Sequence, residues 1–129
     1  MIERMQGLHL TADLSACPVE RPLFGDPAAL RVCCVQAVID VGLSPVGELF
    51  HRFAEGGGVT GVVLLAESHL AVHTWPERAA VTIDVYVCNF SGDNSARAER
   101  LLALLEAAFA PGSVDRQRLQ RGRSVELQA

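Results

Sequence analysis

The chain has 129 residues, of which half are hydrophobic and a fifth charged, with a formal net charge of −4. This length suits one domain over residues 1–129 with its own hydrophobic core. The absence of a basic run argues against a nucleic-acid partner. No hydrophobic run reaches the roughly 18 residues that a bilayer span needs, and the first residues lack a signal-peptide core. We therefore expect a cytoplasmic protein with no membrane partner.

The cysteines offer little framework chemistry. They stand at Cys17, Cys33, Cys34 and Cys88, spacings that match neither a zinc pattern nor a CxxC redox pair. Cys33 and Cys34 lie in a hydrophobic helical run, where buried thiols commonly fill the core. A cytoplasmic chain would also be kept reduced, so we expect no disulfide framework.

The first part of the chain predicts a strand followed by a helix. Residues 8–14 alternate hydrophobic and polar side chains, which is typical of a strand. Asp26-Pro27 matches an N-cap followed by proline at the first helical position. Hydrophobic residues then recur at helical spacing until Gly42, which suits a C-terminal cap. The sequence therefore predicts a helix over residues 27–41.

Three strands are predicted next. Residues 46–53 and 59–66 are joined by Gly56-Gly57-Gly58, a turn that suits an antiparallel pair. The segment 59–66 is uniformly hydrophobic, which favours a central position in the sheet. Residues 80–88 alternate, so one face would carry Val81, Ile83, Val85 and Val87. The other face would carry Ala80, Thr82, Asp84, Tyr86 and Cys88.

A second helix and a last strand complete the predicted fold. Asp93 or Asn94 can cap the helix, and Pro111-Gly112 ends it. Its buried stripe would be Ala98, Leu101, Leu102, Leu105, Ala108 and Phe109, with Arg97, Arg100 and Glu106 outside. Residues 114–120 carry charges that suit an edge strand.

The predicted order is β-α-β-β-β-α-β. This order indicates an α+β two-layer sandwich, in which two helices cover one face of a mostly antiparallel sheet. The other face would carry Tyr86 and Cys88 with some hydrophobic residues from 62–66. Because an exposed apolar sheet face usually finds a partner, we expect a homodimer.

Chemically versatile side chains concentrate between Glu67 and Cys88. Ser68 could be a nucleophile, but no Gly-x-Ser-x-Gly elbow supports a hydrolase. His69 and His73 could suggest a metal site with Cys88. However, strand residues four apart lie about 13 Å apart, so we expect no metal. Taken singly, each of these residues is more often structural than catalytic.

The combination resembles a known family. Glu67-Ser68-His69, then His73-Thr74-Trp75-Pro76-Glu77, then a strand ending at Cys88, resemble the S-adenosylmethionine decarboxylase proenzymes of bacteria and archaea. The resemblance covers nearly the whole chain and includes residues 7–10, 50–53, 60–63 and 121–123.

The resemblance implies that the chain cuts itself between Glu67 and Ser68. The Ser68 hydroxyl would attack the Glu67 carbonyl, and β-elimination and hydrolysis would then leave a pyruvoyl group. The products would be a β chain, residues 1–67, and an α chain, residues 68–129. By the same likeness, His73 abstracts the α-proton and the Thr60 hydroxyl helps position the reacting carbonyl.

The resemblance also implies the reaction. The pyruvoyl group would form a Schiff base with S-adenosylmethionine and accept the electrons left by CO₂. Cys88 would be the proton donor, and Phe53, Trp75 and Glu77 would contact the substrate. The product is the aminopropyl donor for spermidine and other polyamines. No dissociable cofactor is implied.

Some positions depart from the family pattern. Thr60 stands where serine is common, the loop at residues 54–60 differs, and Arg78-Ala79-Ala80 replaces a common aromatic-glycine pair. Two alternatives therefore stay open. The same self-made group could decarboxylate another amino acid, such as ornithine or arginine, or the chain could be an uncleaved, non-enzymatic homologue.

Overall fold

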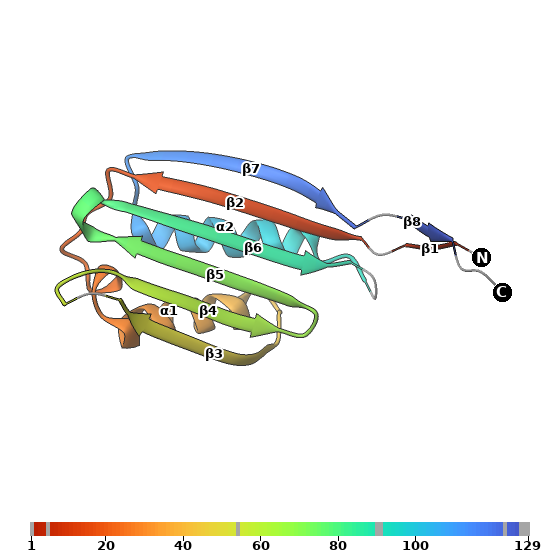
Figure 1. Cartoon of the computed structure of the whole chain (residues 1–129), viewed down its shortest axis with the longest axis horizontal. Helices are drawn as coiled ribbons and strands as arrows, with labels where there is room; N and C mark the ends of the chain where they lie inside the picture. The colour runs from red at the N-terminus through yellow and green to blue at the C-terminus, as the bar shows by residue number, and fades with distance from the viewer. Residues whose placement is uncertain (1, 5, 54, 90–91, 123, 127–129) are drawn as a thin grey trace.

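Six of the strands form one antiparallel sheet in a computed structural model that describes residues 2–4, 6–53, 55–89, 92–122 and 124–126 (Figure 1). The sheet order is β3-β4-β5-β6-β2-β7, and every adjacent pair is antiparallel. In chain order these are β2 (Gly7–Ser15), β3 (Pro45–Arg52), β4 (Val59–Leu65), β5 (Ser68–Trp75), β6 (Ala80–Cys88) and β7 (Ser113–Arg121). A separate pair joins β1 (Ile2–Arg4) to β8 (Ser124–Glu126). Ala54 and Arg123, which fall in segments compared above, lie outside the described residues.

Two α-helices, α1 (Pro27–Asp40) and α2 (Ser95–Phe109), cover one face of the sheet (Figure 1). Asp26 caps α1 as predicted, since its carboxylate accepts the Ala28 N–H at 3.0 Å. Asp93 accepts the Ser95 N–H at 2.9 Å, and this hydrogen bond lowers the pKa of the Asp93 carboxyl. In the described part of the chain, neither helix is long and apolar enough to cross a membrane.

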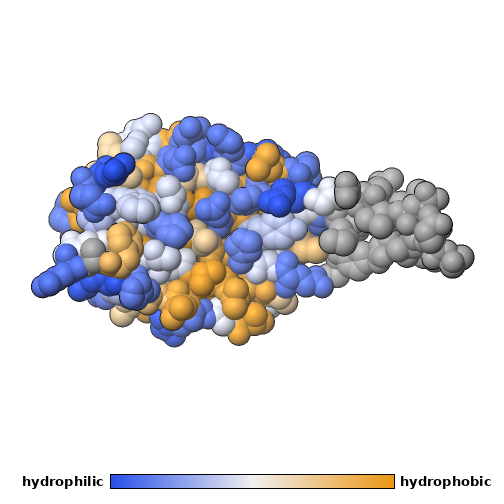
Figure 2. Space-filling view, in the orientation of Figure 1, coloured by the Kyte–Doolittle hydropathy of each residue, from blue (hydrophilic) through white to orange (hydrophobic). Residues whose placement is uncertain are grey.

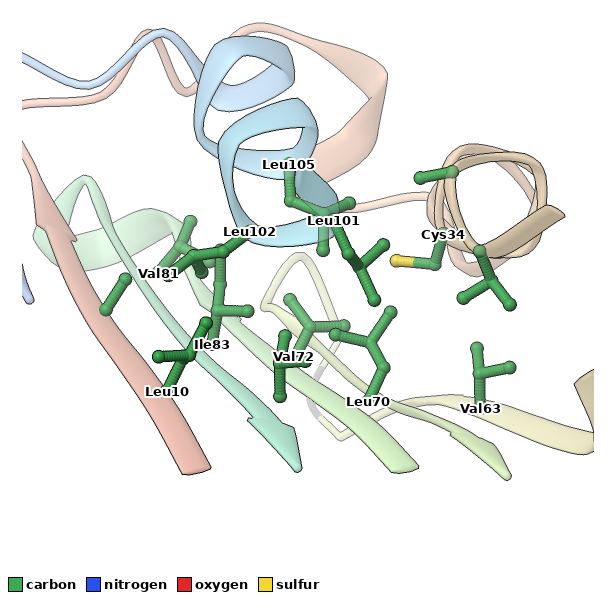
Figure 3. Close-up of a cluster of buried hydrophobic side chains, with 14 of the residues drawn as sticks. Leu10, Cys34, Val63, Leu70, Val72, Val81, Ile83, Leu101, Leu102 and Leu105 are labelled. Carbon is green, nitrogen blue, oxygen red and sulfur yellow. The ribbon is translucent and has the colours of Figure 1, made fainter. Parts of the chain in front are cut away.

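The core lies between the helices and the sheet (Figure 3). Leu101, Leu102 and Leu105 of α2 meet side chains from β2, β5 and β6. Along β6 the predicted alternation is confirmed, because its odd-numbered residues from 81 to 87 are buried and its even-numbered ones are half-buried. The even-numbered residues belong to the uncovered side, which we call the open face.

The α+β class, the two helices and the five predicted strands are confirmed, but the predicted order lacked β5. Along β5, Leu70, Val72 and Thr74 point into the core. Because Thr74 is polar, the alternation of hydrophobic and polar residues along β5 is not evident from the sequence. The structure also contains two short helical turns that the sequence did not predict, η1 (Pro22–Phe24) and η2 (Pro76–Arg78).

The assignment of Glu106 to the outer side of α2 was wrong. Its side chain is buried, and it forms a two-point ion pair with Arg116 of β7. A carboxylate tolerates burial when a guanidinium offers paired donors. This pair closes the sheet edge over α2, where β7 lies as the predicted edge strand.

Candidate active site

The first end of β5 carries Ser68 at a tight turn, which we call the Ser68 end. Leu65 of β4 pairs with Ser68, so the chain reverses at Ala66-Glu67. Glu67 has φ 65°, a left-handed conformation that costs a residue with a side chain about 1–2 kcal/mol. Immediately after it, the Ser68 Oγ accepts a hydrogen bond from the Cys88 N–H at 3.1 Å. The peptide bond predicted to break therefore follows a strained residue and precedes a fixed hydroxyl.

Cys88 is itself held in place from the other side. Its carbonyl accepts a hydrogen bond from the Asn94 side-chain amide at 3.0 Å. The Asn94 N–H in turn donates to the Asn89 side chain at 2.8 Å. The start of α2 is thus tied to the Ser68 end. The sequence marked Asn94 only as a possible helix cap, and its link to Cys88 depends on a fold contact that no local pattern reveals.

The opposite end of β5 holds a second group, the His73 end. Thr60 of β4 pairs with His73 across the strands, and the Thr60 Oγ1 lies 3.1 Å from the His73 Nδ1. The rings of His73 and Trp75 lie 6.4 Å apart, and those of Trp75 and Phe53 lie 5.4 Å apart. Glu77 follows on the exposed turn η2. The predicted processing base, its hydroxyl partner and the two predicted aromatic contacts are therefore brought together, with Glu77 on the adjoining turn.

Thr74, inside the same motif, is a buried support for the His73 end. Its hydroxyl donates to the Phe24 carbonyl and accepts the Val59 N–H, both at 2.8 Å. The loop before β4 also approaches closely, because a Cβ at Gly58 would lie 1.8 Å from the Thr74 carbonyl oxygen. Only glycine fits there. This residue of the motif fixes backbone positions and takes no part in the open face.

The two ends do not meet within one chain. His73 follows Ser68 by five positions on β5, which separates them by about 16 Å at about 3.3 Å per residue. Sequence proximity suggested one cluster, but an extended strand carries its residues apart. Ser68 and Cys88 form one half of the predicted site, and Thr60 and His73 form the other half.

A polar network that the sequence did not predict lies beside the Ser68 end. The His69 ring stacks on Tyr86 with centroids 5.6 Å apart, and the His9 Nε2 lies 3.0 Å from the Asp84 carboxylate. Arg121 lies over the Tyr86 ring at 5.9 Å. His69 and His73 therefore have separate partners and do not converge on a common point.

Among the four free cysteines, Cys88 occupies a distinct environment. Cys34 is fully buried beneath the sheet, and burial raises the pKa of its thiol. Burial also raises the pKa of Cys33 and of Cys17. Cys88 instead ends β6 on the open face, next to Ser68. Of these four cysteines, Cys88 is the one that forms a hydrogen bond with Ser68.

The fold and the grouping of side chains define a two-layer α+β protein with a candidate catalytic face. A family model described as S-adenosylmethionine decarboxylase matches residues 8–122. The chain belongs to this family, as its sequence motifs predicted.

Relatives support the same assignment over most of their length. The S-adenosylmethionine decarboxylase proenzyme of Picrophilus torridus is 34% identical, over 93% of this chain and 87% of its own. The proenzyme of Aquifex aeolicus is 36% identical, over 90% and 81%. The crystal structure of the adenosylmethionine decarboxylase from Aquifex aeolicus superimposes with a TM-score of 0.82, 32% identity and 98% coverage of both chains.

Proposed function

We propose that this protein is a self-processing decarboxylase of S-adenosylmethionine that supplies the aminopropyl donor for polyamine synthesis. The proposal fits a cytoplasmic setting, where reducing conditions keep its four thiols free. The observation that carries it is the Ser68 hydroxyl held by the Cys88 N–H, directly after the left-handed Glu67. These features suit a chain that cuts at this bond, and family membership points to the same chemistry.

Cleavage would proceed through Ser68 itself. Its Oγ bonds to the Glu67 carbonyl carbon as the amide C–N bond breaks, which converts the peptide into an ester. Loss of the Ser68 α-proton to a base then breaks the Cβ–O bond and releases residues 1–67 with a free carboxylate. Hydrolysis of the remaining enamine releases ammonia and leaves a pyruvoyl group at the start of residues 68–129. When formed, this carbonyl supplies the electron sink for loss of CO₂.

The Ser68 position fits such a group. The Cys88 backbone N–H contacts the Ser68 Oγ. The Cys88 side chain lies on the open face of β6. A thiol is a suitable general acid for returning a proton to the substrate carbon. Cys88 would therefore hold the proton that replaces the lost carboxylate.

The base for cleavage would come from a second copy of the chain. His73 lies about 16 Å from Ser68 along β5, too far to take its α-proton. If two open faces stack with a twofold axis through the middle of β5, the Ser68 end of one copy would lie opposite the partner subunit's His73. Stacked sheets lie about 10 Å apart, a gap that facing side chains fill.

The open face is suited to this contact. Its hydrophobic half includes Leu49 of β3, which is 68% exposed, and Leu64 of β4, which is 50% exposed. Val62 of β4 pairs with residues of both β3 and β5. Figure 2 shows the patch in the lower part of the view, over β3 and β4. Ala71 lies at the centre of β5 with a small side chain, which favours close approach. We propose a homodimer of processed units, each made of one α chain and one β chain. Each unit would cover the hydrophobic half of its partner's open face.

The substrate would lie at the His73 end of one copy and the Ser68 end of the other. Phe53 and Trp75 present aromatic faces that can stack an adenine and attract a sulfonium. The Glu77 carboxylate can accept hydrogen bonds from ribose hydroxyls.

Intact mass measures cleavage directly. The purified chain should give two fragments that part between Glu67 and Ser68, whereas Ser68→Ala should remain whole and inactive. Ser113→Ala, at the exposed start of β7, should cut normally. A chain that stays whole after long incubation would contradict the proposal.

Mixing two inactive variants tests the shared site. Ser68→Ala and His73→Ala chains should each stay whole when expressed alone. Coexpressed with different tags, they form mixed dimers in which the intact Ser68 faces the intact His73 of the other chain. The His73→Ala chain should then be cut. If it remains whole in dimers isolated through both tags, His73 does not act across an interface.

A further inference from the structure

A hollow of about 400 Å³ lies beside the His73 end, lined by Trp75, Arg78, Ala80 and Thr82. Ala80 is the cross-strand neighbour of Trp75, and Thr82 is that of His73. The hollow therefore adjoins the Thr60–His73 pair. Its volume falls in the range of about 300–1,000 Å³ that small-molecule sites occupy.

The walls of the hollow have distinct characters. Trp75 supplies a broad aromatic surface, while Ala80 and Thr82 are small and leave the space open. The turn η2 carries Arg78 to the rim and closes at Ala79, which has φ 50°. A flat ring could lie against Trp75 with its edge toward Arg78.

Arg78 is a free cation within the described part of the chain. Its side chain is exposed and forms no hydrogen bond or ion pair with any described residue. Arg116 and Arg118, in contrast, pair with Glu106 and Glu99. A guanidinium has five N–H donors and no acceptor, so a ligand here must offer acceptors.

We propose that Arg78 determines substrate specificity: it binds the nucleoside end of the substrate in this hollow and disfavours diamino acids. This inference rests on the proposed function. Adenine ring nitrogens and ribose oxygens accept hydrogen bonds from a guanidinium. Ornithine and arginine end in cations that only donate, so they meet Arg78 with like charge. The residue thereby acquires a role at a position where this chain departs from its family pattern.

Kinetics of processed enzyme test the role. Arg78→Ala should raise KM for S-adenosylmethionine by about tenfold, the loss expected for one charge-assisted hydrogen bond, with little change in kcat. Arg78→Lys should recover part of the loss. Arg78→Glu should shift the ratio of kcat/KM values by about tenfold or more toward ornithine. The matched control is Arg100→Ala on the exposed side of α2, which should behave as the unaltered enzyme.

Binding separates this inference from the decarboxylase itself. In the Ser68→Ala chain, calorimetry should show adenosine affinity falling by about tenfold with Arg78→Ala and unchanged with Arg100→Ala. Unaltered KM and adenosine affinity in the Arg78 variants, or no adenosine binding by the Ser68→Ala chain, would overturn the inference. If the natural chain never cuts or turns over, yet loses adenosine binding with Arg78→Ala, the proposed reaction fails and the role of Arg78 stands.

Discussion

The two ends of β5 are built in different ways. At the Ser68 end, a strained turn and a backbone N–H fix the hydroxyl. At the His73 end, the Thr60 and His73 side chains contact each other. The buried Thr74 hydroxyl holds the neighbouring backbone through two hydrogen bonds. A position held by backbone survives most side-chain changes, whereas a position held by side chains does not. The comparison therefore predicts that cleavage and turnover respond differently to substitutions at the two ends.

Cys88→Ala should separate the two activities most clearly. The substitution keeps the N–H that holds Ser68, so the chain should still be cut, as intact mass will show. Without the thiol, decarboxylation should fall by about 100-fold or more, a typical contribution of a general acid. Cys33→Ala, a thiol of α1 with no place at the site, should turn over normally. Normal turnover of Cys88→Ala would remove it as the proton donor.

Thr74→Val should destabilise the His73 end. Valine has a similar shape but leaves the Val59 N–H and the Phe24 carbonyl without their partner. We expect the free energy of unfolding to fall by about 1–3 kcal/mol, measured by urea denaturation in the Ser68→Ala background. Thr11→Val on the open face should change stability by less than about 0.5 kcal/mol. Equal effects would show that the buried hydroxyl is not an anchor.

Much of the fold could be predicted because its patterns are local. Asp26-Pro27 marks the start of α1, and the alternation of residues 80–88 defines β6 with its two faces. β5 was missed because Thr74 occupies a core position, which only its partners Phe24 and Val59 explain.

The candidate site could be predicted only as a set of residues. Family likeness selected Ser68, His73 and Cys88, but their arrangement depends on strand register. Extended geometry places Ser68 and His73 at opposite ends of β5, and the antiparallel return of β6 brings Cys88 back to Ser68. The link from Asn94 to Cys88 likewise needs the folded contact between α2 and the sheet.

Thr60 substitutions measure how much the His73 end depends on its side-chain pair. Thr60→Val removes the hydroxyl that lies 3.1 Å from the His73 Nδ1, so cleavage should slow by about tenfold, the value of one hydrogen bond. Thr60→Ser keeps the hydroxyl and frees χ1, so cleavage should be as fast or faster. The time course of fragment formation gives both rates. If the Thr60→Val chain is cleaved at the normal rate, the contact between Thr60 and His73 does not contribute to cleavage.

Glycine substitutions give the smallest effect and compare the backbone of the two ends. Glu67 precedes Ser68 with φ 65°, and Ala79 closes the turn beyond Trp75 with φ 50°. Glycine relieves left-handed strain but costs chain entropy, so each substitution should stabilise the uncut Ser68→Ala chain by about 0.5–1 kcal/mol. Ala66→Gly, at a residue without positive φ, should destabilise it. In the chain that retains Ser68, slower cleavage with Glu67→Gly but not with Ala79→Gly would show that backbone strain at Glu67 promotes breakage of the Glu67–Ser68 bond. Equal cleavage rates would mean that the turn only positions the hydroxyl.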